Sequence, residues 1–144
     1  MPKEITPIIG SDYPLLVVPL IDSAKNSICI LMYDWRWVIN HSGSSVQSFN
    51  QSIVRAVARG VSVRCLVENA YALQPLLEIG AVCKKVLSKN MLHSKLILID
   101  DHVVVLGSHN ISWHAFSTNF ETSVAIDNLE IFAVFRKYFD NLWL

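Results

Sequence analysis

The segment HSKLILIDDHVVVLGSHN, residues 93–110, decides the fold of this chain. Residues 92–99 and 103–106 are dense in apolar and β-branched side chains, as expected of buried strands. Between them, Asp100 and Asp101 are residues that turns favour, because aspartate tolerates the left-handed backbone region and bonds its own backbone. The segment therefore predicts a β-hairpin.

The hairpin determines which polar side chains of this segment share a face. Side chains alternate along a strand, so His93 and Lys95 point to one side. A two-residue turn would pair His93 with Ser108, and a four-residue turn would pair it with Asn110. With either turn length, Ser108 and Asn110 lie on the same face of the hairpin as His93 and Lys95. Gly107 fits a place where the backbone approaches a ligand closely.

The spacing of these groups resembles the signature of the phospholipase D superfamily, in which His-x-Lys, four residues, Asp, six residues and Gly-Ser-x-Asn form half of an active site. The segment Asn-Phe-Glu at 119–121 resembles the Asn-x-Glu segment of the same family. The resemblance implies a phospholipase D-like fold and a metal-independent phosphodiesterase without cofactors. The signature residues in this chain are His93, Lys95, Asp100, Gly107, Ser108, Asn110 and Glu121.

These residue types suit the cleavage of a phosphodiester bond. His93 can attack phosphorus as a neutral imidazole, which splits one displacement into two through a phosphohistidine. Lys95 would neutralise the non-bridging oxygens, with Ser108 and Asn110 as further donors. In the family that the chain resembles, Glu121 would fix the tautomer of His93 and stabilise its charged form. Asp100 is expected to stabilise the hairpin, because a second carboxylate beside a phosphate would repel it.

The motif occurs once, although the leaving oxygen needs a proton from a second titratable group. Of the five histidines, only His93 has a lysine two positions further on. A single half-site predicts a two-fold homodimer in which two copies of His93 meet. Small one-motif members of the resembled family work in this way, whereas longer members fuse two copies.

Strands and helices alternate along the chain, which predicts an α/β fold with a mixed sheet flanked by helices on both faces. Because no linker or repeat interrupts this order, we expect a single domain over residues 1–144. A capping box at Asp127 and Glu130 should begin the last helix, which runs to about residue 142. The other helices are expected at 12–24, 46–59 and 71–79, strands besides the hairpin at 27–33, 61–67, 81–87 and 119–126, and a loop at 34–45.

The composition is apolar for a soluble monomer, with 52% hydrophobic residues and a mean hydropathy of +0.38. Part of this surplus is expected at a subunit interface. No apolar run reaches the ~20 residues of a membrane-spanning helix, and no basic segment precedes the apolar run 15–21, so we expect a cytoplasmic protein. Cys29, Cys65 and Cys83 lack partners at zinc-site spacing, which predicts buried thiols and no metal site.

The charge balance is neutral, with 12 Lys+Arg and 12 Asp+Glu, and so lacks the basic bias common in nucleic-acid binders. The distribution is uneven, since no acidic residue separates Glu78 from Asp100, while Lys84, Lys85, Lys89 and Lys95 fall in that interval. These lysines could track a phosphate backbone. They could equally keep a strand edge soluble, and the sequence leaves both interpretations open.

Aromatic residues follow the first strand and the motif. The segment 33–37 (Tyr-Asp-Trp-Arg-Trp) could stack bases at a groove rim or anchor a dimer, and Trp113 and Phe116 pose the same alternatives. His109 and His114 are interpreted as ordinary loop histidines, and no partner can be named for His41.

The sequence thus predicts a nuclease, an endonuclease by resemblance to small family members, acting as a dimer on nucleic acid. A phospholipid phosphodiesterase that binds membrane lipid is the first alternative. A nucleic-acid-binding module without turnover is the second, although binding alone would not need a nucleophile such as His93.

Overall fold

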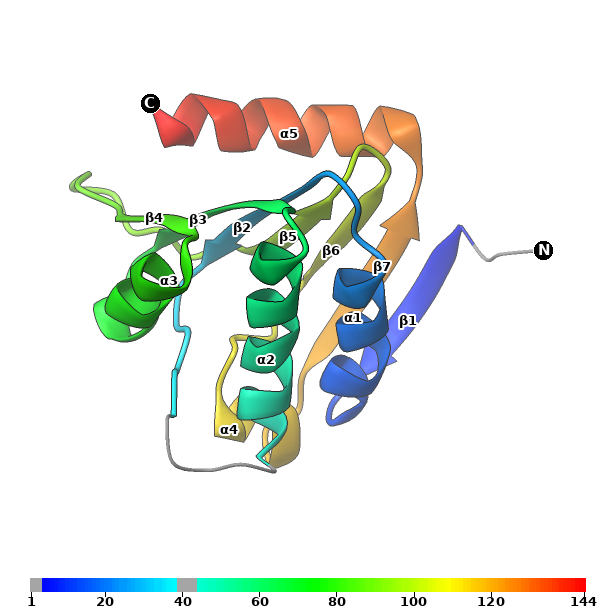
Figure 1. Cartoon of the computed structure of the whole chain (residues 1–144). Helices are drawn as coiled ribbons and strands as arrows, with labels where there is room; N and C mark the ends of the chain where they lie inside the picture. The colour runs from blue at the N-terminus through cyan, green and yellow to red at the C-terminus, as the bar shows by residue number, and fades with distance from the viewer. Residues whose placement is uncertain (1–3, 39–43) are drawn as a thin grey trace.

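The computed structural model describes residues 4–38 and 44–144, which form one seven-stranded sheet with helices on both faces (Figure 1). The strand order is β1-β7-β6-β5-β2-β3-β4. Neighbours from β2 to β4 are parallel and the remaining pairs are antiparallel, so the sheet is mixed, and the predicted fold class is confirmed. The strands are β1 (Ile5–Ile9), β2 (Ser27–Met32), β3 (Ser62–Val67), β4 (Val82–Lys85), β5 (Lys95–Ile99), β6 (Val103–Gly107) and β7 (Thr122–Asp127).

The two faces of the sheet carry unequal layers. Side chains of α1 (Asp12–Asp22), α2 (Ser45–Ala58), α3 (Leu73–Ile79) and α4 (Trp113–Ser117) share one core with the sheet. The opposite face is covered by α5 (Leu129–Trp143) alone, which buries Phe132 and Phe139 against it (Figure 1). A short 3-10 helix, Ala70–Ala72, precedes α3. No helix among the described residues is long and apolar enough to cross a bilayer.

Alternation along the hairpin divides its strands between these two cores. Ile97 and Ile99 of β5 face the larger core, whereas Leu96 and Leu98 face α5. Because β5 and β6 are central strands with both faces covered, their sequence is a continuous apolar run. The predicted strand pair is therefore present, although β5 begins at Lys95 rather than at residue 92.

The turn of the hairpin differs from both lengths expected. Ile99 pairs with Val103, so three residues form the connection, and the predicted even turn is wrong. Asp100 has φ of 55°, and its carboxylate accepts the backbone N–H groups of the segment 25–27, which holds it in this conformation. Continuing the register places Lys95 opposite Gly107 instead of Ser108.

Other differences lie at the ends and edges of the fold. The strand Ile5–Ile9 was not predicted. It is an edge strand, where a proline such as Pro7 is tolerated. The short helix α4 was not expected either. The N-cap of α5 is Asn128, whose side chain accepts a hydrogen bond from the backbone N–H of Ile131. The N-cap predicted at Asp127 is therefore one residue too early.

Candidate active site

Three strand ends meet at one edge of the sheet. His93 immediately precedes β5, Ser108 follows β6, and Glu121 precedes β7. Because β6 is antiparallel to both neighbours, the start of β5, the end of β6 and the start of β7 lie at the same edge. The sequence motif therefore converges at strand ends rather than through the cross-strand pairing expected from an even turn.

His93 and Lys95 form the centre of this edge. The Nζ of Lys95 lies 3.2 Å from each ring nitrogen of His93, and donates to whichever one is unprotonated. The Tyr33 ring, at the end of β2, lies with its centroid 5.2 Å from that of the imidazole and 5.5 Å from Nζ. Burial lowers the pKa of Lys95, and the negative charge of Glu121 opposes that shift. An exposed imidazole thus stands beside a fixed cation.

Ser108 and Glu121 are locked together next to this pair. Ser108 Oγ donates to Glu121 Oε1 at 2.6 Å and accepts the N–H of Thr122 at 3.0 Å. Asn119 Nδ2 donates to Glu121 Oε2 at 3.1 Å. In the single chain, the hydrogen bonds of Glu121 run to Ser108 and Asn119, so its role in orienting His93 stays a prediction.

Asn110 follows in the loop after β6. Its Oδ1 accepts the backbone N–H of Asp34 at 3.2 Å, which ties the end of the motif to the end of β2. This bond uses the acceptor end of the amide and leaves the donor end as the group that could bind a phosphate oxygen. The predicted phosphate contact of Asn110 remains a prediction.

Asp100 and Gly107 serve the scaffold that holds the site. Asp100 lies at the opposite end of β5 from His93, where its carboxylate binds backbone N–H groups 2.8–3.2 Å away. A Cβ on Gly107 would overlap Ser123 of β7. Gly107 thus approaches a neighbouring strand closely, and its approach to a ligand stays a prediction, since Gly107 also lines the pocket beside the motif.

His109 lies in the loop after β6, as predicted, but it is buried and hydrogen-bonded there. Its Nε2 donates to the Gly10 carbonyl at 2.8 Å, which leaves Nδ1 to accept from Ser123 Oγ at 2.6 Å. The ring centroid of Tyr13 lies 4.6 Å away. Burial lowers the pKa of His109, with the Gly10 bond acting in the opposite direction. The sequence offered no signal for this role, because Gly10 lies 99 residues away along the chain.

The two other described histidines have side-chain contacts of their own. His114 contacts Thr118 at 3.2 Å, and His102 contacts Asp127 at 2.7 Å. His41 lies outside the described residues.

The aromatic residues divide between core and surface. Trp35 is fully buried, with its Nε1 donating to Asn50 at 2.8 Å, and Phe116 is buried beside α2. The predicted rim or interface position is therefore wrong for these two residues. Trp113 and Phe120 are exposed, and Phe120 lies between the two hydrogen-bonded residues Asn119 and Glu121.

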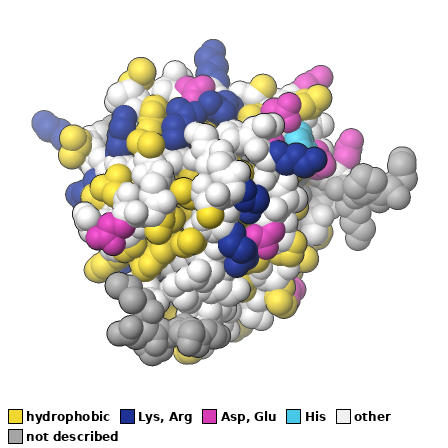
Figure 2. All heavy atoms as spheres, viewed as in Figure 1, with side chains coloured by type: hydrophobic (Ala, Val, Ile, Leu, Met, Phe, Trp, Pro, Cys, Tyr) yellow, Lys and Arg dark blue, Asp and Glu magenta, His cyan; other side chains and the backbone are white. Residues whose placement is uncertain are grey.

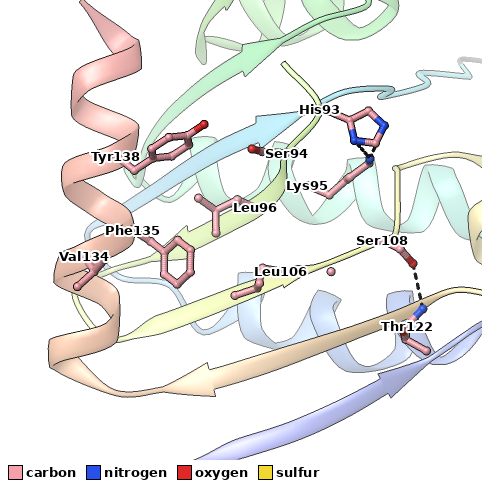
Figure 3. A pocket seen from close by; sticks show the side chains of 11 residues that line it. His93, Ser94, Lys95, Leu96, Leu106, Ser108, Thr122, Val134, Phe135 and Tyr138 are labelled. Carbon is pink, nitrogen blue, oxygen red and sulfur yellow. Dashed lines mark hydrogen bonds between the residues drawn. The ribbon is translucent and has the colours of Figure 1, made fainter. Parts of the chain in front are cut away.

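An apolar pocket of about 820 Å³ opens beside the motif (Figure 3). His93, Lys95 and Ser108 lie at one end of it, and side chains of α5 form the other end (Figure 3). A second pocket of about 770 Å³, here called the basic pocket, shares His93 and Tyr138 with the first and includes Lys84 and Lys85. The apolar pocket is lined by His93, Ser94, Lys95, Leu96, Leu106, Gly107, Ser108, Thr122, Val134, Phe135 and Tyr138.

The cysteines and the charged side chains of the described residues are distributed over the fold. Cys29, Cys65 and Cys83 are free and buried. No three His, Cys, Asp or Glu side chains gather as metal ligands in the ranges 4–38 and 44–144. Positive and negative side chains intermingle on the face seen in Figure 2, in keeping with the neutral balance of the chain.

Comparisons with known proteins agree with this fold. The family model described as "Cardiolipin synthase, PLD-like domain" matches residues 17–143. A mitochondrial cardiolipin hydrolase of Xenopus tropicalis is 31% identical over 102 residues, 64% of this chain and 49% of that protein. The 5'-3' exonuclease PLD4 of Mus musculus is 28% identical over 142 residues, 87% of this chain and 28% of that protein. The chain thus spans half or less of these two relatives.

Among solved structures, the phospholipase D family member Nuc from Salmonella typhimurium superposes with a TM-score of 0.81 at 23% identity. The match covers 97% of this chain and 95% of that one. This likeness shows the fold.

Proposed function

Since the chain belongs to the phospholipase D-like family, we propose that it is a metal-independent phosphodiesterase that hydrolyses nucleic acid as an endonuclease. The observation that carries the proposal is the exposed imidazole of His93 with the Lys95 ammonium 3.2 Å away. A nucleophile and a cation at this spacing suit one phosphate group. We expect the protein to act in the cytoplasm.

The reaction proceeds in two displacements. A ring nitrogen of His93 attacks phosphorus, the bond from phosphorus to the leaving oxygen breaks, and that oxygen takes a proton from a second imidazole. Water then attacks the phosphohistidine and gives a proton back to the second imidazole, which restores both rings. Lys95 and Asn110 hold the non-bridging oxygens during both steps, and Ser108 joins them when its hydroxyl turns from Glu121 to the phosphate. Glu121 orients His93.

The second imidazole comes from a second copy of the chain. His109 is unsuited to the role, because it is buried and both of its ring nitrogens are hydrogen-bonded. Among the other described histidines, His102 lies at the edge of the sheet opposite the site, where it contacts Asp127, and His114 contacts Thr118 on α4 through Nδ1. A two-fold axis beside His93 would supply the missing acid without any further residue type.

Two observations support nucleic acid as substrate. PLD4 is named an exonuclease, and the lysines at 84, 85 and 89 leave a local positive excess beside the site. A phospholipid is the second candidate, supported by the relative named cardiolipin hydrolase. A nucleic-acid-binding module without catalytic activity is the third candidate, and an assay has to distinguish it from the two enzymes.

A substrate panel tests the proposal. The protein is incubated with single- and double-stranded DNA, RNA and cardiolipin vesicles, with and without chelator. Nucleic-acid cleavage that survives the chelator is expected, and His93→Ala should abolish it, whereas His114→Ala should not. Cleavage of lipid alone would favour the second candidate, binding without cleavage the third, and loss of cleavage with chelator would contradict the metal-free reaction.

A mixing experiment tests the shared site. When wild-type and His93→Ala chains are exchanged in equal amounts, a site that needs both imidazoles should retain about a quarter of the activity, because only wild-type pairs work. Independent subunits would retain about half. The exchange is followed by mass measurement of differently tagged chains.

A further inference from the structure

The loop that follows β3 lies at the same edge of the sheet as the motif. Because β2 is parallel to β3 and antiparallel to β5, the ends of β2 and β3 meet the start of β5. Tyr33 follows β2, and its carbonyl accepts the backbone N–H of Asn69 at 3.1 Å. The Glu68 carboxylate accepts the backbone N–H of Leu92, the residue before His93, at 3.0 Å. The residues after β3 are therefore tied directly to the segment that carries the motif.

Arg36 and Tyr71 stack on each other at this edge, and we call them the Arg–Tyr pair. The Cζ of Arg36 lies 3.9 Å from the centroid of the Tyr71 ring, and Nε of Arg36 donates to Asp34 Oδ1 at 2.9 Å. The backbone is held as well, since the N–H of Arg36 donates to the Ile111 carbonyl at 2.8 Å. The N–H of Asp34 donates to Asn110 of the motif. The guanidinium plane is thus fixed in one orientation beside a motif residue.

The Arg–Tyr pair contributes surface rather than core. Tyr71 is 56% exposed and the Arg36 side chain 46%, whereas Trp35, the neighbour of Arg36, is fully buried. A ring that stays exposed buries little apolar area, so it adds little to the stability of the fold. A guanidinium over a tyrosine face is a planar, delocalised cation, and such planes stack on other flat π-systems. The pair therefore suits the binding of a flat ligand.

We propose that the Arg–Tyr pair stacks the base of a nucleotide beside the scissile phosphate, so that the site takes single-stranded nucleic acid. This inference rests on the proposed function and narrows its substrate. In the sheet, β2 lies between β5 and β3, and neighbouring strands are ~4.8 Å apart, so the loop after β3 begins roughly 10 Å from the start of β5. A nucleotide adjacent to the phosphate held by His93 and Lys95 can span this separation.

The need for a flat face decides between the candidate substrates. In a duplex the bases are paired and stacked on one another, so a base meets a protein ring only after it is turned out at a cost in unpairing and unstacking. The bases of a single strand are already accessible, and every base has a π-face. The acyl chains of a phospholipid offer no planar group of this kind. Because Asp34 balances the charge of Arg36, stacking rather than attraction for phosphate is the main contribution of the pair.

The first experiment measures the binding of DNA oligonucleotides by fluorescence anisotropy in the His93→Ala background. A single strand should bind more tightly than the duplex of the same sequence. Tyr71→Leu should weaken single-strand binding by about tenfold, because one stack between base and ring is lost, and should leave duplex binding unchanged. Tyr71→Phe keeps the ring and should keep the affinity. Leu77→Ala is the control, since Leu77 is exposed on α3, the helix that follows the pair, and circular dichroism shows whether each variant is folded.

A second experiment removes the base instead of the ring. An oligonucleotide is made abasic at one position at a time, which keeps every phosphate. At the position that meets the Arg–Tyr pair, loss of the base should weaken binding by about tenfold when Tyr71 is present and have almost no effect in Tyr71→Leu. A penalty of equal size in both proteins at every position would overturn the inference.

Cleavage assays distinguish the failure of this inference from the failure of the proposed function. Cleavage of single and double strands at equal rates by the unmutated chain would overturn the single-strand preference and leave the proposed function standing. Base-dependent binding through Tyr71 without any cleavage by the unmutated chain would instead overturn the proposed function and leave the stacking role of the Arg–Tyr pair standing.

Discussion

At the scale of single residues, Lys95 must keep its charge if it is to neutralise a phosphate. Burial lowers its pKa, and the carboxylate of Glu121 raises it. Glu121→Gln removes only the second influence, so the pKa of Lys95 should fall further. The alkaline limb of kcat/KM against pH should therefore move to lower pH.

The control for this experiment is Asp127→Asn, because Asp127 ends β7 at the edge opposite the site. Its substitution should leave the alkaline limb in place. A limb that moves to higher pH in Glu121→Gln, or one that does not move, would show that Lys95 does not set it.

Gly107 is the residue whose replacement should damage the scaffold most directly. An added Cβ would overlap both the backbone and the side chain of Ser123. Gly107→Ala should lower the free energy of unfolding by about 1–3 kcal/mol or more, as overpacking does. Urea unfolding measures the loss. Gly60→Ala is the control, since Gly60 also has positive φ but open space around its Cβ position, so only the backbone strain of about 1–2 kcal/mol applies.

At the scale of elements, the β5–β6 turn depends on Asp100. Burial raises the pKa of this carboxyl, but hydrogen bonds from the backbone of Asn26, Ser27 and Lys25 outweigh burial and lower it. A lowered pKa in the folded state means stability that is present above the ordinary aspartate pKa of about 4 and lost as pH falls through the folded value. The turn should therefore loosen in acid.

Asp100→Asn tests this dependence. The substitution should cost about 1–3 kcal/mol at neutral pH, because charge-assisted bonds to three backbone N–H groups are weakened. It should also reduce the fall in stability below about pH 4, since the titrating group is gone. Asp101→Asn, at an exposed position in the same turn, should do neither. Urea midpoints across pH give both quantities.

The same turn shows where sequence reasoning stops. The apolar runs and the Asp pair predict a hairpin from local information alone. The turn length depends on hydrogen bonds between the Asp100 carboxylate and the backbone of the segment 25–27. This segment lies 73 to 75 positions earlier in the chain, so no local pattern contains the information. The strand β1 is hidden for a similar reason, because Ile5 pairs with Ile126 at the other end of the chain.

The candidate site shows the same division. The motif predicts that His93, Lys95 and Ser108 lie together, and all three line one pocket, although they meet at strand ends and not through the predicted register. It could not show that Trp35 and Phe116 are core residues, because aromatic side chains serve cores and surfaces alike and only packing decides between them.

At the scale of the whole molecule, neutral net charge means that any attraction for nucleic acid must come from local cations. Lys84 Nζ donates to the backbone carbonyl of Trp143 at 3.3 Å and lies 4.2 Å from the centroid of the Trp143 ring. Lys85 and Lys89 are exposed near the basic pocket and have more freedom to meet a phosphate. These two lysines should therefore carry much of the salt dependence of binding.

The double variant Lys85→Gln/Lys89→Gln tests whether they contact a single strand. Each lost phosphate contact should reduce the slope of log K against log salt by ~0.7, so the pair should reduce it by about 1.4. Binding of a DNA oligonucleotide is measured by fluorescence anisotropy in the His93→Ala background, where no cleavage is expected. Lys25→Gln is the control, because Lys25 lies beside Asp100 at the far end of β5. An unchanged slope would mean that these lysines only solubilise the edge of β4, and the case for a nucleic-acid substrate would lose its electrostatic support.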